Sequence, residues 1–296
     1  MARIPAFVNS GGGSAEAALE SLERHDAFEI RLTPPDQLSD ALGKAVKAGA
    51  PRVLVAGGDG TLASAAGALA GSETALAVLP GGTLNHFARD QGIPTDLDEA
   101  LALATAGRVA SVDVGYVNDQ LFLNTSSVGA YVRFVELRDR LERHLGYRTA
   151  SLLAGLRILG GARQTRVTLE AEGAGRVYRT RFAFVAVGER VLTPPKLGRL
   201  AGEPGGALHV VIPRGRRQAR RLARAFARTD RDHPVEPKPL GLDAALVQRL
   251  RLDLIAPTVK VATDGEISRM KTPLEYRLER GALKVVLPVP DLESPG

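Results

Sequence analysis

The stretch RVLVAGGDGTLASAAGAL (residues 52–69) decides the fold of the first third of the chain. Arg52–Ala56 has the continuous apolar pattern of a buried strand, glycines follow, and Thr61–Leu69 has the pattern of a helix. Continuous apolar strands that alternate with helices are typical of a parallel sheet covered on both faces. We therefore expect an open, doubly wound sheet, which binds its ligands at the carboxyl ends of the strands.

The neighbouring sequence repeats this alternation. Further strands are predicted at Ala6–Ser10, Ala27–Thr33 and Ala75–Pro80, and a helix is predicted at Asp36–Lys47. After about residue 107 the pattern changes to short strands with turn signals, which favours an antiparallel, sandwich-like domain. The expected architecture is α/β plus β, with an N-terminal nucleotide domain at 1–110 and a β-rich domain at 111–290.

The expected elements of the second domain are two strands within 109–129, joined at Asn118-Asp119, and two helices at 131–142 and 147–159. The remaining expected strands are 165–171, 179–187, 208–212, 250–255, 258–262, 276–279 and 283–287.

Composition excludes several classes of protein. The 296 residues are 44 % hydrophobic and 24 % charged, which is a globular balance and sufficient for two cores. With no cysteine, the chain has no disulfide, thiolate nucleophile or cysteine–zinc site. With 4 % aromatic residues and no Trp, base stacking on aromatic platforms is disfavoured. We identify no signal peptide and no apolar run long enough to span a membrane, so a cytoplasmic protein is expected.

The sharpest motif is Gly57-Gly58-Asp59-Gly60-Thr61, between the strand and the helix quoted above. Glycines there let backbone N–H groups approach a phosphate, and a helix N-terminus favours negative charge. An ordinary turn capped by Asp59 needs fewer glycines, so the motif favours a nucleotide site. It is not a Walker A loop, because no Gly-Lys-Ser/Thr follows. A dehydrogenase is disfavoured because Val78-Leu79-Pro80, at the end of the next strand, supplies no acid for a ribose.

A second glycine loop, PGGTLNHFAR at 80–89, follows the next buried strand. Two such loops at neighbouring strand ends can converge on one ligand. Thr83 and Asn85 supply short polar side chains there. Thr83 as a helix cap and Phe87 as a core residue are compatible with that role.

Taken together, these motifs resemble the diacylglycerol kinase and sphingosine kinase family of lipid kinases, particularly its soluble bacterial members. The matching pieces extend over nearly the whole chain. They are Asn9 with its glycines, Thr33, GGDGT at 57–61, GGTLNHFARDQGIP at 81–94, VDVGYVNDQLFLNTSSVG at 112–129 and Asp264-Gly265-Glu266.

The resemblance implies an ATP-dependent kinase that phosphorylates a lipid hydroxyl, such as that of diacylglycerol, in phospholipid metabolism. It implies ATP contacts from the N-terminal domain and a lipid cleft completed by the second domain. The implied nucleotide-binding residues are Asn9, Thr33, Gly57, Gly58, Asp59, Gly60, Thr61, Leu62 and Thr83. The resemblance also places Asp264 and Glu266 in the active site, with either as general base.

Phosphoryl transfer needs positioned phosphates, Mg²⁺ to neutralise charge, and a base near the accepting hydroxyl. Asp59 is a candidate for holding Mg²⁺ or for acting as base, and Asp264 and Glu266 could share these duties. By itself, TDGE at 263–266 would indicate a type I turn between two strands. The alternatives are an NAD kinase, which also carries GGDGT after a strand, and a nucleotide- or lipid-binding protein without catalysis.

The chain departs from the family pattern in three places. Its first loop is Asn9-Ser10-Gly11-Gly12-Gly13, where relatives usually have Asn-Pro and a later Ser-Gly. In the second domain, relatives usually carry an Asn and a glycine cluster where this chain has Gly188-Glu189-Arg190-Val191. This altered loop leaves the identity of the lipid substrate open. Pro204-Gly205-Gly206-Ala207-Leu208 has no carboxylate where relatives often place an Asp that helps a structural Mg²⁺ site.

Positive charge is concentrated in one segment. The net charge is +6, yet residues 214–231 contain eight Arg and one Asp, so the remaining chain is nearly neutral. Arg217, Arg221, Arg224 and Arg228 fall on one side of an expected amphipathic helix. Two interpretations of the segment are open. It is either an ordinary solvent-exposed helix face or a helix face that is attracted to an anionic membrane surface. We expect peripheral membrane contact and no nucleic acid partner, and a homodimer remains open.

Overall fold

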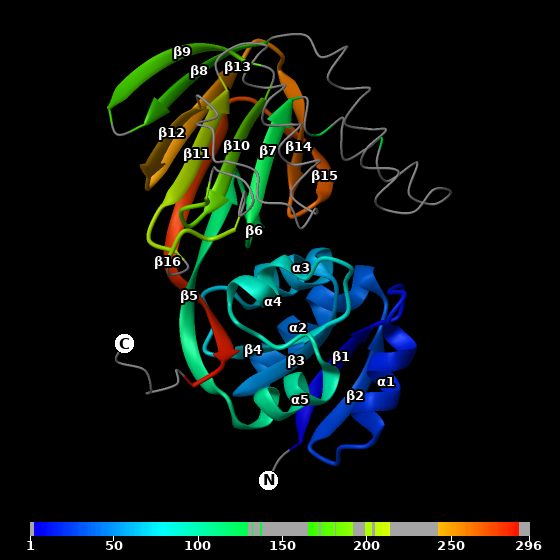
Figure 1. Ribbon diagram of the computed structural model, residues 1–296. Helices are drawn as coiled ribbons and strands as arrows, with labels where there is room; N and C mark the ends of the chain where they lie inside the picture. Colours follow the sequence, from blue (N-terminus) through cyan, green and yellow to red (C-terminus); the bar gives the residue numbers. More distant parts are fainter. Residues whose placement is uncertain are drawn as a thin grey trace, which may run out of the picture. The chain divides into compact units, whose positions relative to one another are not determined.

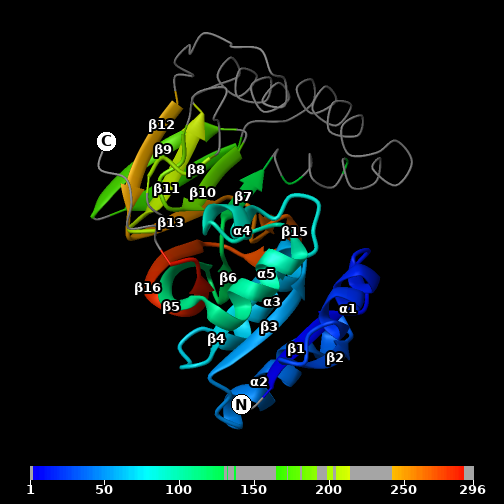
Figure 2. The same cartoon turned by 60° about the horizontal axis from the view of Figure 1, so that its bottom comes forward.

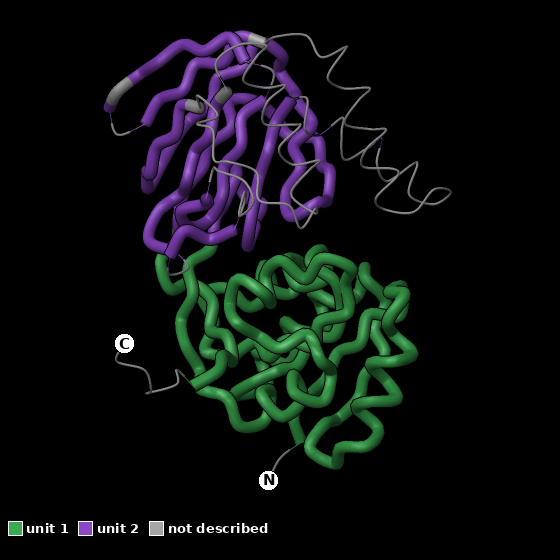
Figure 3. The backbone as a smooth tube through the Cα atoms, in the orientation of Figure 1, with its two compact units in different colours: residues 1–114, 279–296 green, residues 115–278 purple. Residues whose placement is uncertain are grey.

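The computed structural model (Figure 1) describes residues 3–129, 165–171, 173–180, 182–191, 199–202, 205–213 and 242–289, together with Val132 and Leu137. The chain divides into two compact units, coloured separately in Figure 3. Unit 1 comprises residues 1–114 and 279–296, and unit 2 comprises residues 115–278. The chain therefore passes from unit 1 to unit 2 and back to unit 1. The expected domains at 1–110 and 111–290 imply that the chain passes from one domain to the other once.

Unit 1 contains parallel strands in the order β2-β1-β3-β4, and β16 pairs with β4, also in parallel. The strand bounds are β1 Ile4–Asn9, β2 Phe28–Thr33, β3 Arg52–Gly57, β4 Ala75–Pro80 and β16 Leu274–Leu287. The helices are α1 Ala15–Glu23, η1 Pro35–Gln37, α2 Leu38–Lys47, α3 Asp59–Leu69, α4 His86–Asp90 and α5 Leu97–Ala106.

Helices cover both faces of the unit 1 sheet, of which Figure 2 gives a second view. On one face, α1 and α5 share a core with alternate residues of the strands, including Ala6, Val8, Leu54 and Ala77. The strand residues between these are also buried, and α2 and α3 pack on that side. Because both faces are covered, the strands are apolar throughout. The doubly wound fold is confirmed.

Unit 2 consists of two antiparallel layers around one core. One layer has the order β12-β11-β10-β7-β14-β15, and the other contains β16-β13-β8-β9. Val185 and Val261 of the first layer and Leu252 and Tyr276 of the second belong to the same buried cluster. The antiparallel, sandwich-like second domain is therefore confirmed.

The strand bounds in this part of the chain are β5 Arg108–Val117, β6 Gln120–Phe122, β7 Thr125–Gly129, β8 Thr165–Ala171, β9 Ala174–Thr180, β10 Phe182–Val187 and β11 Leu208–Pro213. The remaining strands are β12 Leu242–Val247, β13 Arg249–Leu254, β14 Thr258–Thr263 and β15 Glu266–Lys271.

Several elements differ from the expectation. Helices α1 and α5 and strands β12 and β15 were not expected. The expected strand at 179–187 is two strands, because β9 pairs in one layer and β10 in the other. The two expected strands at 276–279 and 283–287 form the single strand β16. Gly281 lies within it at φ 59° and donates its N–H to Asp113 Oδ1 at 2.8 Å, so the strand continues through this irregularity.

The expected helices at 131–142 and 147–159 and the arginine segment at 214–231 lie outside the described residues, apart from Val132 and Leu137. Within the part of the chain that the structure describes, no helix is both long and apolar enough to cross a membrane.

Candidate active site

The carboxyl ends of the unit 1 strands bring the predicted nucleotide residues together. The register aligns Asn9 of β1 with Thr33 of β2, and Gly57 of β3 with Pro80 of β4. Residues from four separate stretches of sequence thus lie along one edge of the sheet. This edge is where open α/β sheets bind their ligands.

Helix α3 starts directly after this edge. Gly58 has an extended conformation and precedes the helix, and Leu62 is the first residue to donate its N–H back, to Gly58 O at 3.0 Å. No described residue accepts the N–H groups of Asp59, Gly60 or Thr61. Such unsatisfied N–H groups and the helix dipole favour an anion at this position.

Asn9 fixes the side chain of Thr61. The Asn9 amide donates from Nδ2 to Thr61 Oγ1 at 2.7 Å, and its Oδ1 accepts the N–H of Gly11 at 2.9 Å. The Thr61 side chain also packs against Gly57. A Cβ added at Gly57 would lie only 2.6 Å from Thr61 Cβ, so this position has no room for a side chain. Because Thr61 Oγ1 accepts from Asn9, its hydroxyl proton remains available to a ligand.

The two glycine loops do lie together, as expected from their strands. Gly81 N donates to Gly57 O at 2.9 Å, and an added Cβ on Gly82 would lie 2.8 Å from Gly58 Cα. Ser14, at the start of α1, donates its hydroxyl to Gly81 O at 2.6 Å. Glycine is required at this contact because backbone packs against backbone.

Asp59 connects the first loop to helix α4. Its carboxylate accepts the N–H of His86 at Oδ2 and the N–H of Phe87 at Oδ1, both at 3.2 Å. The ordinary cap position of α4, Asn85, makes no side-chain cap bond, so Asp59 caps this helix from another part of the chain. Each carboxylate oxygen retains acceptor capacity toward a cation.

The other predicted nucleotide-binding residues, Thr33, Leu62 and Thr83, differ in burial and in the hydrogen bonds of their side chains. Thr33 is buried, its hydroxyl donates to Arg31 O at 3.0 Å, and its carbonyl accepts the Ser10 N–H at 3.1 Å. Leu62, a residue of α3, is fully buried. Thr83 is exposed, and no described residue bonds to its hydroxyl. Of these three, Thr83 therefore offers a side-chain hydroxyl to a ligand.

Sequence reasoning named Asn85 as a polar side chain of the second loop but missed the bond that it forms within the turn. Asn85 adopts φ 49° and accepts the Gly82 N–H at 2.8 Å through Oδ1, so it fixes the turn. Asn tolerates this left-handed conformation better than most residues. Ser14 was also missed. A serine just before an alanine-rich helix is a cap signal, but its bond to Gly81 spans 67 residues.

In unit 2, Asp264 and Glu266 lie at the hairpin that joins β14 to β15. Asp264 and Gly265 form its two-residue loop at φ 49° and 93°. Both values are positive, as type I′ hairpin turns require, so the type I expectation was wrong. A type I′ turn matches the twist of the two strands, which a type I turn would not.

Asp264 is fastened to a neighbouring turn by its carboxylate. Oδ2 accepts the Leu123 N–H at 2.6 Å, and Oδ1 accepts the N–H groups of Asn124 at 2.8 Å and Thr125 at 2.9 Å. Glu266 is exposed, and among the described residues none donates to its carboxylate. The two acids therefore differ: Asp264 holds the β6–β7 turn, while Glu266 is available.

The altered loop at 188–191 is fixed by a buried histidine. His209 Nδ1 accepts the Arg190 N–H at 2.8 Å, and Arg190 Nη2 donates to Val187 O at 2.9 Å. Burial lowers the pKa of His209, opposed by Glu189 and assisted by Arg190. Because Nδ1 accepts the Arg190 N–H, the neutral form of the imidazole carries its proton on Nε2.

The strands with these loops match a known catalytic domain. Residues 3–117 match the model of the diacylglycerol kinase catalytic domain, a range that contains both glycine loops. Over residues 3–117 the chain is therefore similar to that domain family. The resemblance to lipid kinases inferred from the motifs is confirmed.

Curated relatives of this chain carry lipid kinase names. "Probable lipid kinase YegS-like" of Cronobacter sakazakii is 36 % identical over 152 residues, 49 % of this chain and 50 % of that protein. The protein of the same name from Klebsiella pneumoniae is 35 % identical over 158 residues, 49 % of this chain and 53 % of that protein. The chain thus spans about half the length of the curated relatives it matches.

Solved structures support the fold. A crystal structure described as a diacylglycerol kinase from Bacillus anthracis str. Sterne is 18 % identical, covers 98 % of both chains and has a TM-score of 0.70. Another solved Bacillus anthracis structure, 21 % identical, has a TM-score of 0.77 over 98 % of this chain and 96 % of the other. At these identities the likeness supports the fold alone.

Proposed function

We propose that the protein is an ATP-dependent lipid kinase that transfers the γ-phosphoryl group to a lipid hydroxyl, such as that of diacylglycerol. The observation that carries this proposal is the pair of packed glycine loops beside the unpaired N–H groups of α3. They lie inside the part of the chain that matches the diacylglycerol kinase catalytic domain.

In this proposal, unit 1 binds the phosphates of ATP. The N–H groups of Asp59, Gly60 and Thr61 and the Thr61 hydroxyl donate to phosphate oxygens, and Thr83 adds a hydroxyl from the second loop. Asn9 is a positioning residue, because its amide orients Thr61. Preorganised donors of this kind stabilise charge that develops during phosphoryl transfer.

The residues present also fit Mg²⁺ bound together with ATP. Mg²⁺ usually takes one or two carboxylates, with substrate phosphates and water as its other ligands. Asp59 provides one carboxylate beside the phosphate loop, and no cluster of three acidic or histidine side chains is found among the described residues. When bound, Mg²⁺ would neutralise phosphate charge.

Asp264 and Glu266 are the proposed acidic pair of unit 2, with one of them accepting the proton of the lipid hydroxyl. A primary alcohol becomes a good nucleophile only when its proton is accepted. The Asp264 carboxylate also holds Leu123, Asn124 and Thr125, so its replacement would disturb structure as well as chemistry. Glu266 makes no such bond to a described residue.

NAD kinase is the second candidate, because NAD kinases also carry the motif GGDGT directly after a strand. A nucleotide- or lipid-binding protein without catalytic activity is the third. The test incubates the purified protein with γ-labelled ATP and either diacylglycerol or NAD, with and without Mg²⁺. We expect label in a phosphorylated lipid, and only with Mg²⁺. Label in NADP would support the NAD kinase instead, while ATP binding without any labelled product would support the inactive protein.

A further inference from the structure

Three basic side chains lie on one face of the β14–β15 hairpin. Lys260 of β14 and Arg269 and Lys271 of β15 are all exposed. The register places Lys260 directly opposite Arg269, and Thr258 opposite Lys271. The alternate residues of both strands face the core of unit 2, namely Val259, Val261 and Met270. The basic side chains therefore occupy the outer face of the hairpin.

Two of these side chains, Arg269 and Lys271, carry charge that no described residue neutralises. No described residue forms a hydrogen bond or an ion pair with the side chain of Arg269 or Lys271. The hairpin is also the edge of its sheet, since β15 has β14 as its neighbour at the end of the strand order.

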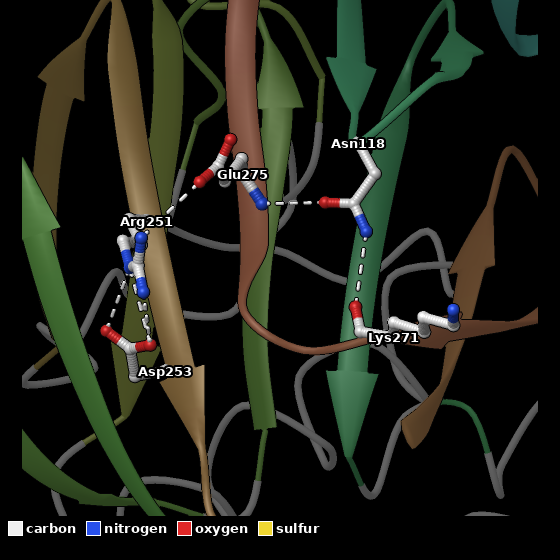
Figure 4. Close-up of polar contacts among 5 residues, drawn as sticks. All are labelled: Asn118, Arg251, Asp253, Lys271 and Glu275. Carbon is white, nitrogen blue, oxygen red and sulfur yellow. Dashed lines mark hydrogen bonds and ion pairs between the residues drawn. The ribbon is translucent and has the colours of Figure 1, made fainter. Parts of the chain in front are cut away.

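A nearby arginine shows the opposite arrangement (Figure 4). Arg251 on β13 is paired with Asp253 at 3.2 Å and with Glu275 at 3.4 Å. In Figure 4 the Glu275 carboxylate points toward Arg251, while the Lys271 side chain extends in a different direction. Toward the described residues, Lys271 forms hydrogen bonds through its main chain, whose carbonyl accepts from Asn118 Nδ2 at 3.2 Å. The charge of Arg251 is thus neutralised, whereas no described residue neutralises Arg269 or Lys271 of β15.

A highly exposed apolar side chain lies close to these charges. Ile255, just before β14, is 80 % exposed. The residues that follow it are bonded to Thr272, the neighbour of Lys271: Thr272 Oγ1 donates to Ala256 O at 2.7 Å and Thr272 N to Pro257 O at 3.0 Å. Ile255 therefore lies at the same end of the hairpin as Lys271.

We propose that Ile255, Arg269 and Lys271, called here the hairpin surface, bind the surface of an anionic lipid bilayer. The proposal rests on the proposed function, which requires a substrate that resides in a membrane. Lipid phosphates complement the basic side chains, and the isoleucine enters the headgroup region. A nucleic acid backbone would use the charges but gain little from an isolated isoleucine, so the bilayer is favoured.

The test measures co-sedimentation with vesicles in the absence of ATP. The vesicles contain phosphatidylcholine alone or phosphatidylcholine mixed with phosphatidylglycerol. The double variant Arg269→Gln/Lys271→Gln should lose about fivefold in affinity for the mixed vesicles per charge removed, the equivalent of ~1 kcal/mol each. Ile255→Ser should weaken binding to both vesicle types, because it removes the apolar contact.

The matched control is Lys44→Gln/Lys47→Gln on α2 of unit 1, which removes the same net charge from exposed positions. It should keep the parent's affinity within about twofold, since the lost charges lie outside the hairpin surface. Arg269→Lys retains the charge and should bind like the parent. Equal losses in the control and the hairpin variant, or unchanged binding in the hairpin variant, would overturn the proposal.

A second readout separates this proposal from the kinase itself. Turnover of a short-chain diacylglycerol dissolved as monomers should be the same in the parent and in the hairpin variants. Absence of turnover in the parent would contradict the proposed function while leaving the vesicle result intact. Loss of monomer turnover in the hairpin variants alone would overturn the assignment of this surface to membrane binding.

Discussion

The amide of Asn9 donates a 2.7 Å hydrogen bond to the hydroxyl oxygen of Thr61, 52 residues later in the chain. Strand β1 thereby determines how the first turn of α3 presents its hydroxyl. Because the oxygen accepts from Asn9, the hydroxyl proton is directed elsewhere, and no described residue accepts it. Three of the predictions below concern this loop and its partner.

Replacing Thr61 by Val removes the hydroxyl while keeping the shape of the side chain. A hydrogen bond to a charged group contributes about 1.5–3 kcal/mol, so we expect kcat/KM for ATP to fall about 10- to 150-fold. Steady-state kinetics measures this loss, and Thr61→Ser should remain close to the parent. Parent-like kinetics for Thr61→Val would show that the hydroxyl does not bind phosphate.

Replacing Gly82 by Ala should separate the two glycine loops. The new methyl would lie 2.8 Å from Gly58 Cα and 2.9 Å from Asn85 Oδ1, so the backbone must move. We expect activity to fall by at least about tenfold, since small displacements of catalytic groups are costly. The control is Gly67→Ala in α3, which meets no atom within 4 Å and should stabilise the helix by up to ~1 kcal/mol. An active Gly82→Ala enzyme of parental stability would contradict the close packing.

Replacing Asp59 by Ala should remove a helix cap and a ligand for Mg²⁺ together. We expect at least ~100-fold lower activity, because charge placement at the phosphates is lost. The matched control is Asp96→Ala, since the Asp96 side chain caps α5 through the N–H groups of Asp98 and Glu99. Both variants should lose ~1 kcal/mol of stability. Similar activities for the two variants would leave Asp59 with a capping role alone.

Asp264 and Glu266 are distinguished by stability. Asp264→Ala leaves three buried or half-buried N–H groups without their acceptor and should lower the free energy of unfolding by about 3 kcal/mol. Glu266→Gln should leave that free energy unchanged. If Glu266 is the base, its variant should lose ~10²–10⁴ in kcat. Chemical denaturation with kinetics measures both quantities, and a stable Asp264→Ala variant would refute its role in holding the turn.

Alkaline pH should destabilise the protein through Tyr276. Burial raises the pKa of Tyr276 to about 12, with its hydroxyl 3.1 Å from that of Ser126. The unfolded chain releases this proton near pH 10, the folded chain only near pH 12, so stability falls as pH rises between these values. The slope is about 1.4 kcal/mol per pH unit for this group. Tyr276→Phe should lack this component, and equal slopes in both proteins would contradict it.

The sheet of unit 1 was predictable because its signals are local. Arg52–Gly57 and Ala75–Pro80 are apolar throughout, and glycines mark where each strand ends. The meeting of the two glycine loops followed from their positions at neighbouring strand ends. The bond of Ser14 to Gly81 was not predictable, because it depends on where α1 lies.

The role of Asp264 was hidden for the same reason. Its loop sequence indicates a turn, yet the carboxylate bonds to residues about 140 positions earlier. Likewise, Arg280-Gly281 looks like a break between two strands. The acceptor that allows β16 to continue, Asp113, comes from a distant strand. Local patterns therefore predicted elements well and long-range polar contacts poorly.

The return of the chain to unit 1 through β16 has a consequence for synthesis. Residues leave the ribosome in order, so the β2-β1-β3-β4 sheet emerges early, with one side of β4 lacking its neighbour. The neighbour is the end of β16, where Val285 aligns with Leu76. An unpaired strand edge is an open template for pairing with other chains. The nascent protein must therefore protect this edge during the time needed to translate the whole of unit 2.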